Sequence, residues 1–176
     1  GHARGVPDIY AMEVKTNPIS GTLFSPVTCM MNICWGGDSW SEYAQLLINR
    51  NKNLVRGQEG FIPLEEPKYP KNLVLNITRD GQPVKYATVN IYREEMYKNS
   101  DHVTAFIWET LGTDGLLSLS PVTLFNGAGG GIGYGVLLIE VVDGESKTYR
   151  YIPVYEVQIA YLKGDTDQYT IEIKCD

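Results

Sequence analysis

Hydrophobic and polar positions alternate along most of the chain after residue 70. Leu73, Leu75 and Ile77 recur at every second position, which is the period of a strand with one buried face. Residues 136–142 form a long apolar run, which predicts a strand at the centre of a sheet. The other β-rich segments are residues 87–92, 103–110, 116–119, 147–155, 156–162 and 168–174.

Turn sequences separate these segments. Asp80-Gly81 is a strong hairpin signal, and we expect Val84 and residues 87–92 to form the returning strand. Further turn signals lie at residues 113–115 and at Asp143-Gly144. Short strands at roughly regular spacing predict a mainly β fold, a seven- to eight-stranded β-sandwich.

One segment before residue 60 has a helical period instead. Ser39 and Glu42 fit a capping box, and Gly57 is a plausible end signal. These signals predict a helix over about residues 39–56, so the sandwich carries a short α-containing N-terminal segment. The apolar positions with helical spacing are Trp40, Tyr43, Ala44 and Leu47.

Three prolines divide the chain into two parts. Pro63, Pro67 and Pro70 each lack an N–H group and favour extended backbone before them. We therefore predict a proline-rich linker at residues 60–70. It separates an N-terminal part, residues 1–59, from a β-sandwich accessory domain, residues 71–176.

Composition excludes several classes of function. The chain is 43% hydrophobic and 20% charged, which suffices for a folded core. The net charge is −6 and no cluster of Lys and Arg stands out, which argues against a nucleic-acid partner. No apolar run is long enough for a membrane-spanning segment. Cys29 and Cys34 could form a local disulfide or remain buried thiols.

Other motifs have ordinary explanations. The glycine-rich residues 126–135 lack the following helix of a phosphate loop, so we predict a connection between strands. His102 has no second metal ligand at a suitable spacing. Asp165 and Asp167 lack the glycine and closing glutamate of a calcium loop. No Ser/His/Asp arrangement is evident, and we predict no catalytic residue.

The first ten residues contain a sharper pattern. Gly5 follows His2 by three positions and Asp8 follows it by six. They resemble the second half of the extended zincin motif, His-Glu-x-x-His-x-x-Gly-x-x-His/Asp, in which a helix holds two zinc ligands and a glutamate base. The resemblance implies that His2 is the second histidine ligand, Gly5 the turn and Asp8 the third ligand. An ordinary turn with an incidental histidine is the alternative. Gly1 is either native or the remnant of an expression tag.

Two further resemblances agree with the first. Residues 28–36 are similar to the methionine-containing turn beneath the zinc of metzincin-like peptidases, with Met30 or Met31 under the ligands. Residues 72–92 resemble the opening of a transthyretin-like or carboxypeptidase-regulatory-like domain, which often follows secreted bacterial peptidases. Together the resemblances imply the C-terminal fragment of a secreted zinc metallopeptidase.

This resemblance implies one function for the intact parent and another for the fragment. The intact parent would bind zinc and hydrolyse a peptide or protein substrate, and it would be secreted, periplasmic or at the cell surface. The first histidine and the glutamate base of the motif are absent here, so His2 and Asp8 form an incomplete zinc site. The fragment itself is expected to be inactive and without a cofactor, and its partner would be the upstream part of the catalytic domain.

Two alternatives belong to other classes of function. One is a non-enzymatic cell-surface binding or adhesion module, in which the N-terminal segment only caps the sandwich. The other is a sandwich that binds a small ligand or sugar through Trp108 or Tyr134. A His-Glu pair encoded just upstream of Gly1 would separate the peptidase hypothesis from both.

Overall fold

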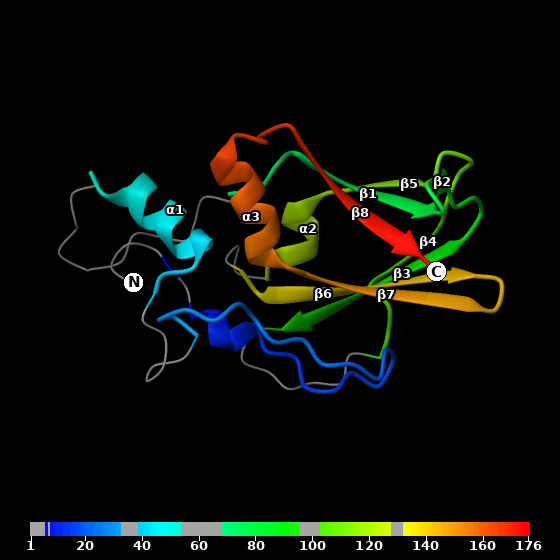
Figure 1. Ribbon diagram of the computed structural model, residues 1–176, viewed down its shortest axis with the longest axis horizontal. Helices are drawn as coiled ribbons and strands as arrows, with labels where there is room; N and C mark the ends of the chain where they lie inside the picture. The colour runs from blue at the N-terminus through cyan, green and yellow to red at the C-terminus, as the bar shows by residue number, and fades with distance from the viewer. Residues whose placement is uncertain (1–5, 7, 33–38, 54–67, 96–102, 128–131) are drawn as a thin grey trace.

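The computed structural model describes residues 6, 8–32, 39–53, 68–95, 103–127 and 132–176. These residues form two four-stranded sheets packed face to face, which confirms the predicted mainly β fold. Figure 1 shows one sheet above the other, with two helices closing one end of the space between them. None of the helices in the described residues is long and apolar enough to cross a membrane.

The strands are β1 (Asn72–Arg79), β2 (Gln82–Pro83), β3 (Thr88–Glu95), β4 (Ile107–Thr110), β5 (Leu116–Leu119), β6 (Tyr134–Asp143), β7 (Ser146–Pro153) and β8 (Gln168–Cys175). The helices are α1 (Glu42–Asn51), α2 (Pro121–Phe125), α3 (Val154–Lys163) and a 3-10 helix, η2 (Ile9–Met12).

The first sheet is built around β1. Strand β8 runs parallel to β1 over its whole length, from Asn72 opposite Gln168 to Arg79 opposite Cys175. Strands β5 and β2 pair antiparallel with successive parts of β1, so they share its other edge. The last strand of the chain therefore lies beside the first strand of the sandwich and closes the fold.

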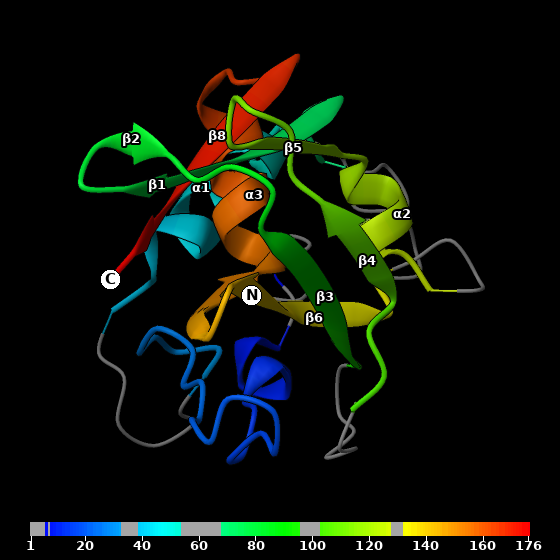
Figure 2. The same cartoon turned by 90° about the vertical axis from the view of Figure 1, so that its right-hand side faces the viewer.

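The second sheet has the order β4-β3-β6-β7. Residues 136–142 lie in β6, between β3 and β7, so the predicted central position is confirmed. Figure 2 shows β3 and β6 side by side below the first sheet. The residues that this sheet contributes to the core between the sheets include Val89, Ile91, Leu137, Ile139 and Val141, all of them buried.

The predicted hairpin is correct at its turn and wrong in its second strand. Asp80 and Gly81 have positive φ angles of 51° and 75°, as a tight two-residue turn requires. Only the two-residue β2 returns along β1, while residues 88–95 cross to the second sheet and pair with β4 and β6. An alternating pattern shows that a face is buried but not which sheet the strand joins.

The strand predicted over residues 156–162 is wrong, because this segment lies in helix α3. The helix starts after Pro153 and ends at Gly164, whose φ of 119° suits a glycine C-cap. Val154, Val157 and Ala160 are buried at helical spacing. A short apolar run fits both periods, and the parallel pairing of β8 with β1 requires a crossover such as this helix.

Helix α1 confirms a helical N-terminal segment but corrects its start. Its N-cap is Ser41 rather than Ser39, and the Ser41 hydroxyl accepts a hydrogen bond from the Ala44 amide at 3.3 Å. The predicted end signal, Gly57, lies outside the described residues. The helix packs against α3, where the Tyr43 hydroxyl donates a hydrogen bond to the side chain of Gln158.

The segment before α1 covers part of the outer face of the second sheet. In Figure 1 this blue segment runs along the side of β6 and β7 that faces away from the first sheet. The Asn17 amide donates to Glu94 of β3 at 2.8 Å, and the Tyr151 hydroxyl donates to the Thr22 carbonyl at 3.0 Å.

Residues 54–67 lie outside the described part, so the domain boundary at residues 60–70 stays a prediction.

Gly115 provides a test of the packing between the turns and β1. A Cβ atom added there would lie 2.7 Å from the Ile77 carbonyl oxygen, whereas one added at Gly144 would meet nothing within 4 Å. Both glycines have positive φ, 69° and 62°. We expect Gly144→Ala to lower the free energy of unfolding by about 1 kcal/mol through backbone strain alone.

Gly115→Ala should cost about 2 kcal/mol more than Gly144→Ala, because β1 cannot move away from the added methyl group without disturbing both of its neighbours. Urea unfolding of the two variants measures the difference. Equal losses of stability would show that the close approach at Gly115 is absent.

Candidate functional site

The residues of the predicted zinc site are only partly described. The Ile9 amide donates to the Met31 carbonyl at 3.0 Å, so the backbone beside Asp8 adjoins the predicted methionine turn. The Asp8 carboxylate accepts a hydrogen bond from the Tyr10 hydroxyl at 3.2 Å. Met31 is buried in the core and Met30 is 46% exposed.

No zinc centre can be assembled from the described residues. Within the described ranges, no group of three or more His, Cys, Asp or Glu side chains could hold a metal ion. His2, Gly5, Cys34 and His102 lie outside those ranges, so the incomplete zinc site stays an untested prediction. Cys29 is buried as a free thiol.

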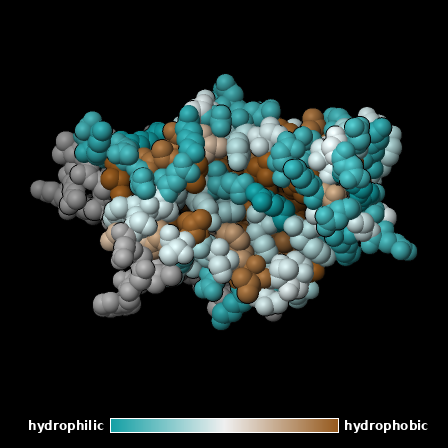
Figure 3. All heavy atoms as spheres, viewed as in Figure 1, coloured by the Kyte–Doolittle hydropathy of each residue, from teal (hydrophilic) through white to brown (hydrophobic). Residues whose placement is uncertain are grey.

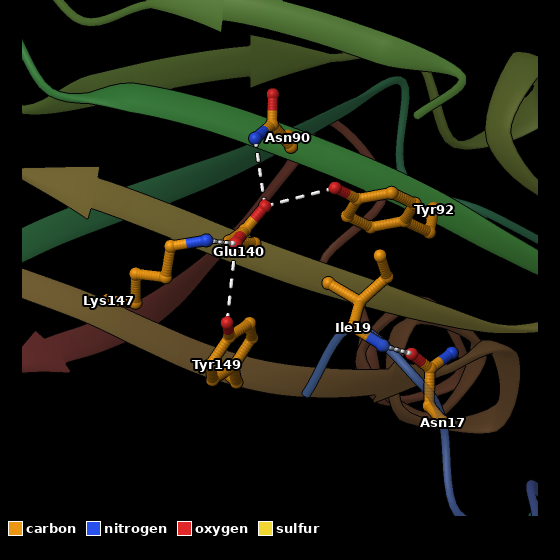
Figure 4. A network of polar contacts seen from close by, with 7 residues as sticks. All are labelled: Asn17, Ile19, Asn90, Tyr92, Glu140, Lys147 and Tyr149. Carbon is orange, nitrogen blue, oxygen red and sulfur yellow. Dashed lines mark hydrogen bonds and ion pairs between the residues drawn. The ribbon is translucent and has the colours of Figure 1, made fainter. Parts of the chain in front are cut away.

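The structure instead assembles a polar cluster around Glu140, on the outer face of the second sheet (Figure 4). Its side chain is only 4% exposed and receives four hydrogen bonds. The donors to one oxygen are Asn90 Nδ2 at 2.9 Å and the Tyr92 hydroxyl at 3.0 Å. The donors to the other are Lys147 Nζ at 2.9 Å and the Tyr149 hydroxyl at 3.3 Å.

The position of Glu140 follows from the pleat of β6. Ile139 and Val141 point into the core between the sheets, so Glu140 points to the opposite face. Asn90 and Tyr149 lie directly across from it on β3 and β7. Three adjacent strands thus supply the carboxylate and its donors.

The cluster fixes the charge state of its members. Burial is the largest influence on the Glu140 carboxyl and opposes ionisation, but the hydrogen bonds from Lys147, Asn90 and Tyr92 outweigh it, so the pKa of Glu140 is lowered. Burial, together with the hydrogen bond to Glu140, raises the pKa of Tyr92 to about 12. The carboxylate is ionised and the phenol protonated at neutral pH, which suits a fixed polar platform rather than proton transfer.

Trp108 lies beside the Glu140 cluster, on the edge strand β4. It lies directly across from Asn90 on β4, so Trp108, Asn90, Glu140 and Tyr149 form one row across four strands. Trp108 is 68% exposed. Asn90 Oδ1 is buried and accepts no hydrogen bond from the described residues. This end of the outer face combines an open aromatic ring with immobilised polar groups.

Sequence reasoning found one member of this site and missed the rest. Trp108 was a candidate because of its aromatic side chain. The apolar run 136–142 predicts a buried strand but gives Glu140 no role, although a single carboxylate inside such a run signals a buried, satisfied charge. Its donors Asn90 and Lys147 come from other strands and carry no local signal.

Comparison with known proteins identifies no family. No protein-family model and no curated protein matches the chain. A mutant of the shaft pilin SpaA from Lactobacillus rhamnosus GG matches at 18% identity, covering 60% of this chain and 48% of the pilin chain, with a TM-score of 0.37. A mercury-inhibited catechol 1,2-dioxygenase from an Acinetobacter species matches at 13% identity over 60% of this chain and 52% of its own, with a TM-score of 0.32. Scores this low support no inference about function.

The lowered pKa of Glu140 predicts a specific acid sensitivity. The ionised carboxylate stabilises the fold at pH values above its pKa in the unfolded chain, about 4.3, and this contribution is lost as the pH falls through the lower folded pKa. Glu140→Gln removes the charge, so we expect it to lower the free energy of unfolding by about 2 kcal/mol at pH 7.

The difference between wild type and Glu140→Gln should shrink toward zero as the pH falls below about 4. Urea unfolding at pH 7, 5 and 3 measures it. Glu109→Gln, on the exposed strand β4, is the control and should change stability little at any of these pH values. A constant difference across the series would mean that ionisation of Glu140 does not stabilise the fold.

Proposed function

We propose that this chain is a non-enzymatic binding module of a cell surface and that it binds carbohydrate on the outer face of its second sheet. The observation that carries the proposal is the exposed indole of Trp108 beside the Glu140 cluster. An aromatic ring stacks on the apolar face of a sugar ring, while neighbouring polar groups bind the hydroxyls.

The surroundings of Trp108 match a ligand rich in hydroxyl groups. Polar residues lie beside it on the same face: Asn90 and Thr88 on β3, and Thr110 on β4. A large contiguous apolar patch would mark a site for a protein partner. On the side drawn in Figure 3, hydrophobic residues form separate areas among hydrophilic ones.

Rigidity supports a binding role for this face. Glu140 holds Asn90, Lys147 and Tyr149 by hydrogen bonds, so a ligand would not need to immobilise these side chains on binding. The same bonds occupy the carboxylate and keep it ionised. A glycosidase acid would need a carboxyl group with a raised pKa, and Glu140 has the opposite shift.

Placement at a cell surface rests on the resemblance of residues 72–92 to accessory domains of secreted proteins. The more specific hypothesis from that resemblance, a fragment of a zinc peptidase, stays a prediction without support among the described contacts. His2 carries that hypothesis, and the native sequence upstream of Gly1 decides it.

Affinity electrophoresis tests the binding proposal. The protein is run in gels containing xylan, laminarin, mannan or hydroxyethylcellulose, and we expect at least one polysaccharide to retard it. Trp108→Ala should weaken the retarding interaction about 10-fold or more, because it removes the stacking surface.

Tyr86→Ala is the matched control. Tyr86 is also 68% exposed, but it lies in the connection between β2 and β3 and not in the row of Trp108, Asn90 and Glu140. Its loss should leave the retardation unchanged. The proposal fails if no polysaccharide retards the wild type, or if the two variants lose binding equally.

A further inference from the structure

Arg93 is held in an unusual position at the end of the sandwich that α2 closes. It follows Val89 and Ile91 on the face of β3 that points into the core. Its guanidinium carbon lies 3.3 Å from the ring centroid of Phe106 and 4.0 Å from that of Tyr134. The two rings pack on the guanidinium group, whose N–H groups can still donate to a polar ligand.

The position of Arg93 reflects the ends of three strands. Phe106 immediately precedes β4, and its amide donates to the Ile91 carbonyl at 2.8 Å. Tyr134 begins β6 and lies across from Glu95, where the ladder between β3 and β6 shifts register. These irregularities bring both rings to the side chain of Arg93.

A cavity of about 320 Å³ opens beside the guanidinium group. Its walls combine one cation with aromatic and small side chains: Arg93, Thr104, Ala105, Phe106 and Tyr134. The volume lies at the lower end of the range for small-molecule sites. It therefore suits a ligand with one ring rather than an extended chain.

Arg93 makes no salt bridge with an acidic side chain of the described residues. Arg79 and Arg150 pair with Asp143 and Glu156, but Arg93 takes part in no ion pair within the described ranges. Within the same ranges, Arg93 Nη1 donates a long hydrogen bond, of 3.5 Å, to the Thr123 carbonyl. Among the described residues this guanidinium group has no counter-charge, and a planar guanidinium group pairs with an anion that presents two oxygens in a plane.

We propose that the Arg93 cavity binds a small organic carboxylate that carries a single ring. The carboxylate pairs with the N–H edge of the guanidinium group, and the ring lies along Phe106 and Ala105. This site lies on the core-facing side of the second sheet, whereas Trp108 and the Glu140 cluster lie on its outer face, so the inference does not depend on the proposed carbohydrate face.

Such a carboxylate could belong to an aromatic acid or to a sugar acid, and two probes distinguish them. The first probe is hippurate, a benzoylated glycine with a peptide-like carboxylate, and the second is glucuronate, a sugar acid. Their neutral analogues are hippuramide and glucose. The chain carries a net charge of −6, so long-range attraction does not favour an anion, and we expect a dissociation constant on the order of 1 mM.

Titration followed by ¹⁵N-resolved NMR tests the proposal. Hippurate, glucuronate or both should shift the Arg93 Nε–H signal and the amides of residues 104–106 and 134, while the neutral analogues should not. Binding of only one acid identifies the source. No shift with either acid at about 20 mM, or equal shifts with the neutral analogues, would overturn the proposal.

Variants test whether binding depends on the guanidinium group of Arg93. Arg93→Gln should abolish the shifts, and Arg93→Lys should weaken binding about 5-fold or more, because an ammonium group cannot form the bidentate pair. Arg150→Gln, on the exposed part of β7, and Trp108→Ala should both bind as wild type does. Binding that persists in a folded Arg93→Gln protein would contradict the site.

Discussion

A buried carboxylate fixes the second sheet of this protein. Glu140 is ionised and almost inaccessible to solvent, and such a group is tolerated only where donors replace the lost water. Asn90, Tyr92, Lys147 and Tyr149 supply them from the two strands beside β6. A slip of β6 by one residue would turn Glu140 into the apolar core between the sheets. The carboxylate would then be buried without its hydrogen-bond donors, which would strongly destabilise the fold. The cluster therefore sets the register of the sheet as well as the chemistry of its outer face.

The two faces of this sheet differ because of that register. The outer face carries a rigid polar row that ends at the open indole of Trp108. The inner face is apolar until β3 reaches the end of the sandwich, where Arg93 takes the next inward position beside a cavity. Two proposed sites, one for carbohydrate and one for a carboxylate, thus lie on opposite sides of the same strands.

Local sequence signals predicted the parts of the fold that local physics determines. The alternation of Leu73, Leu75 and Ile77, and the positive-φ turn at Asp80-Gly81, gave the first strand and its turn correctly. Residues 156–162 were predicted as a strand because a short apolar run fits both periods, and pairing of β8 with β1 makes them a helix. The donors around Glu140 and the rings around Arg93 come from different strands, so no local pattern could predict either site. The zinc prediction on His2 stays untested.

The most direct test of the account is to locate a bound sugar on the sheet. Titration of the ¹⁵N-labelled protein with xylohexaose, laminarihexaose, mannohexaose and cellohexaose maps the contact residue by residue. The account predicts that one of them shifts the Trp108 indole N–H together with amides of residues 88–90 and 147–149. Shifts confined to the first sheet, or no shift with any of the four, would contradict the assignment of the outer face as the binding surface.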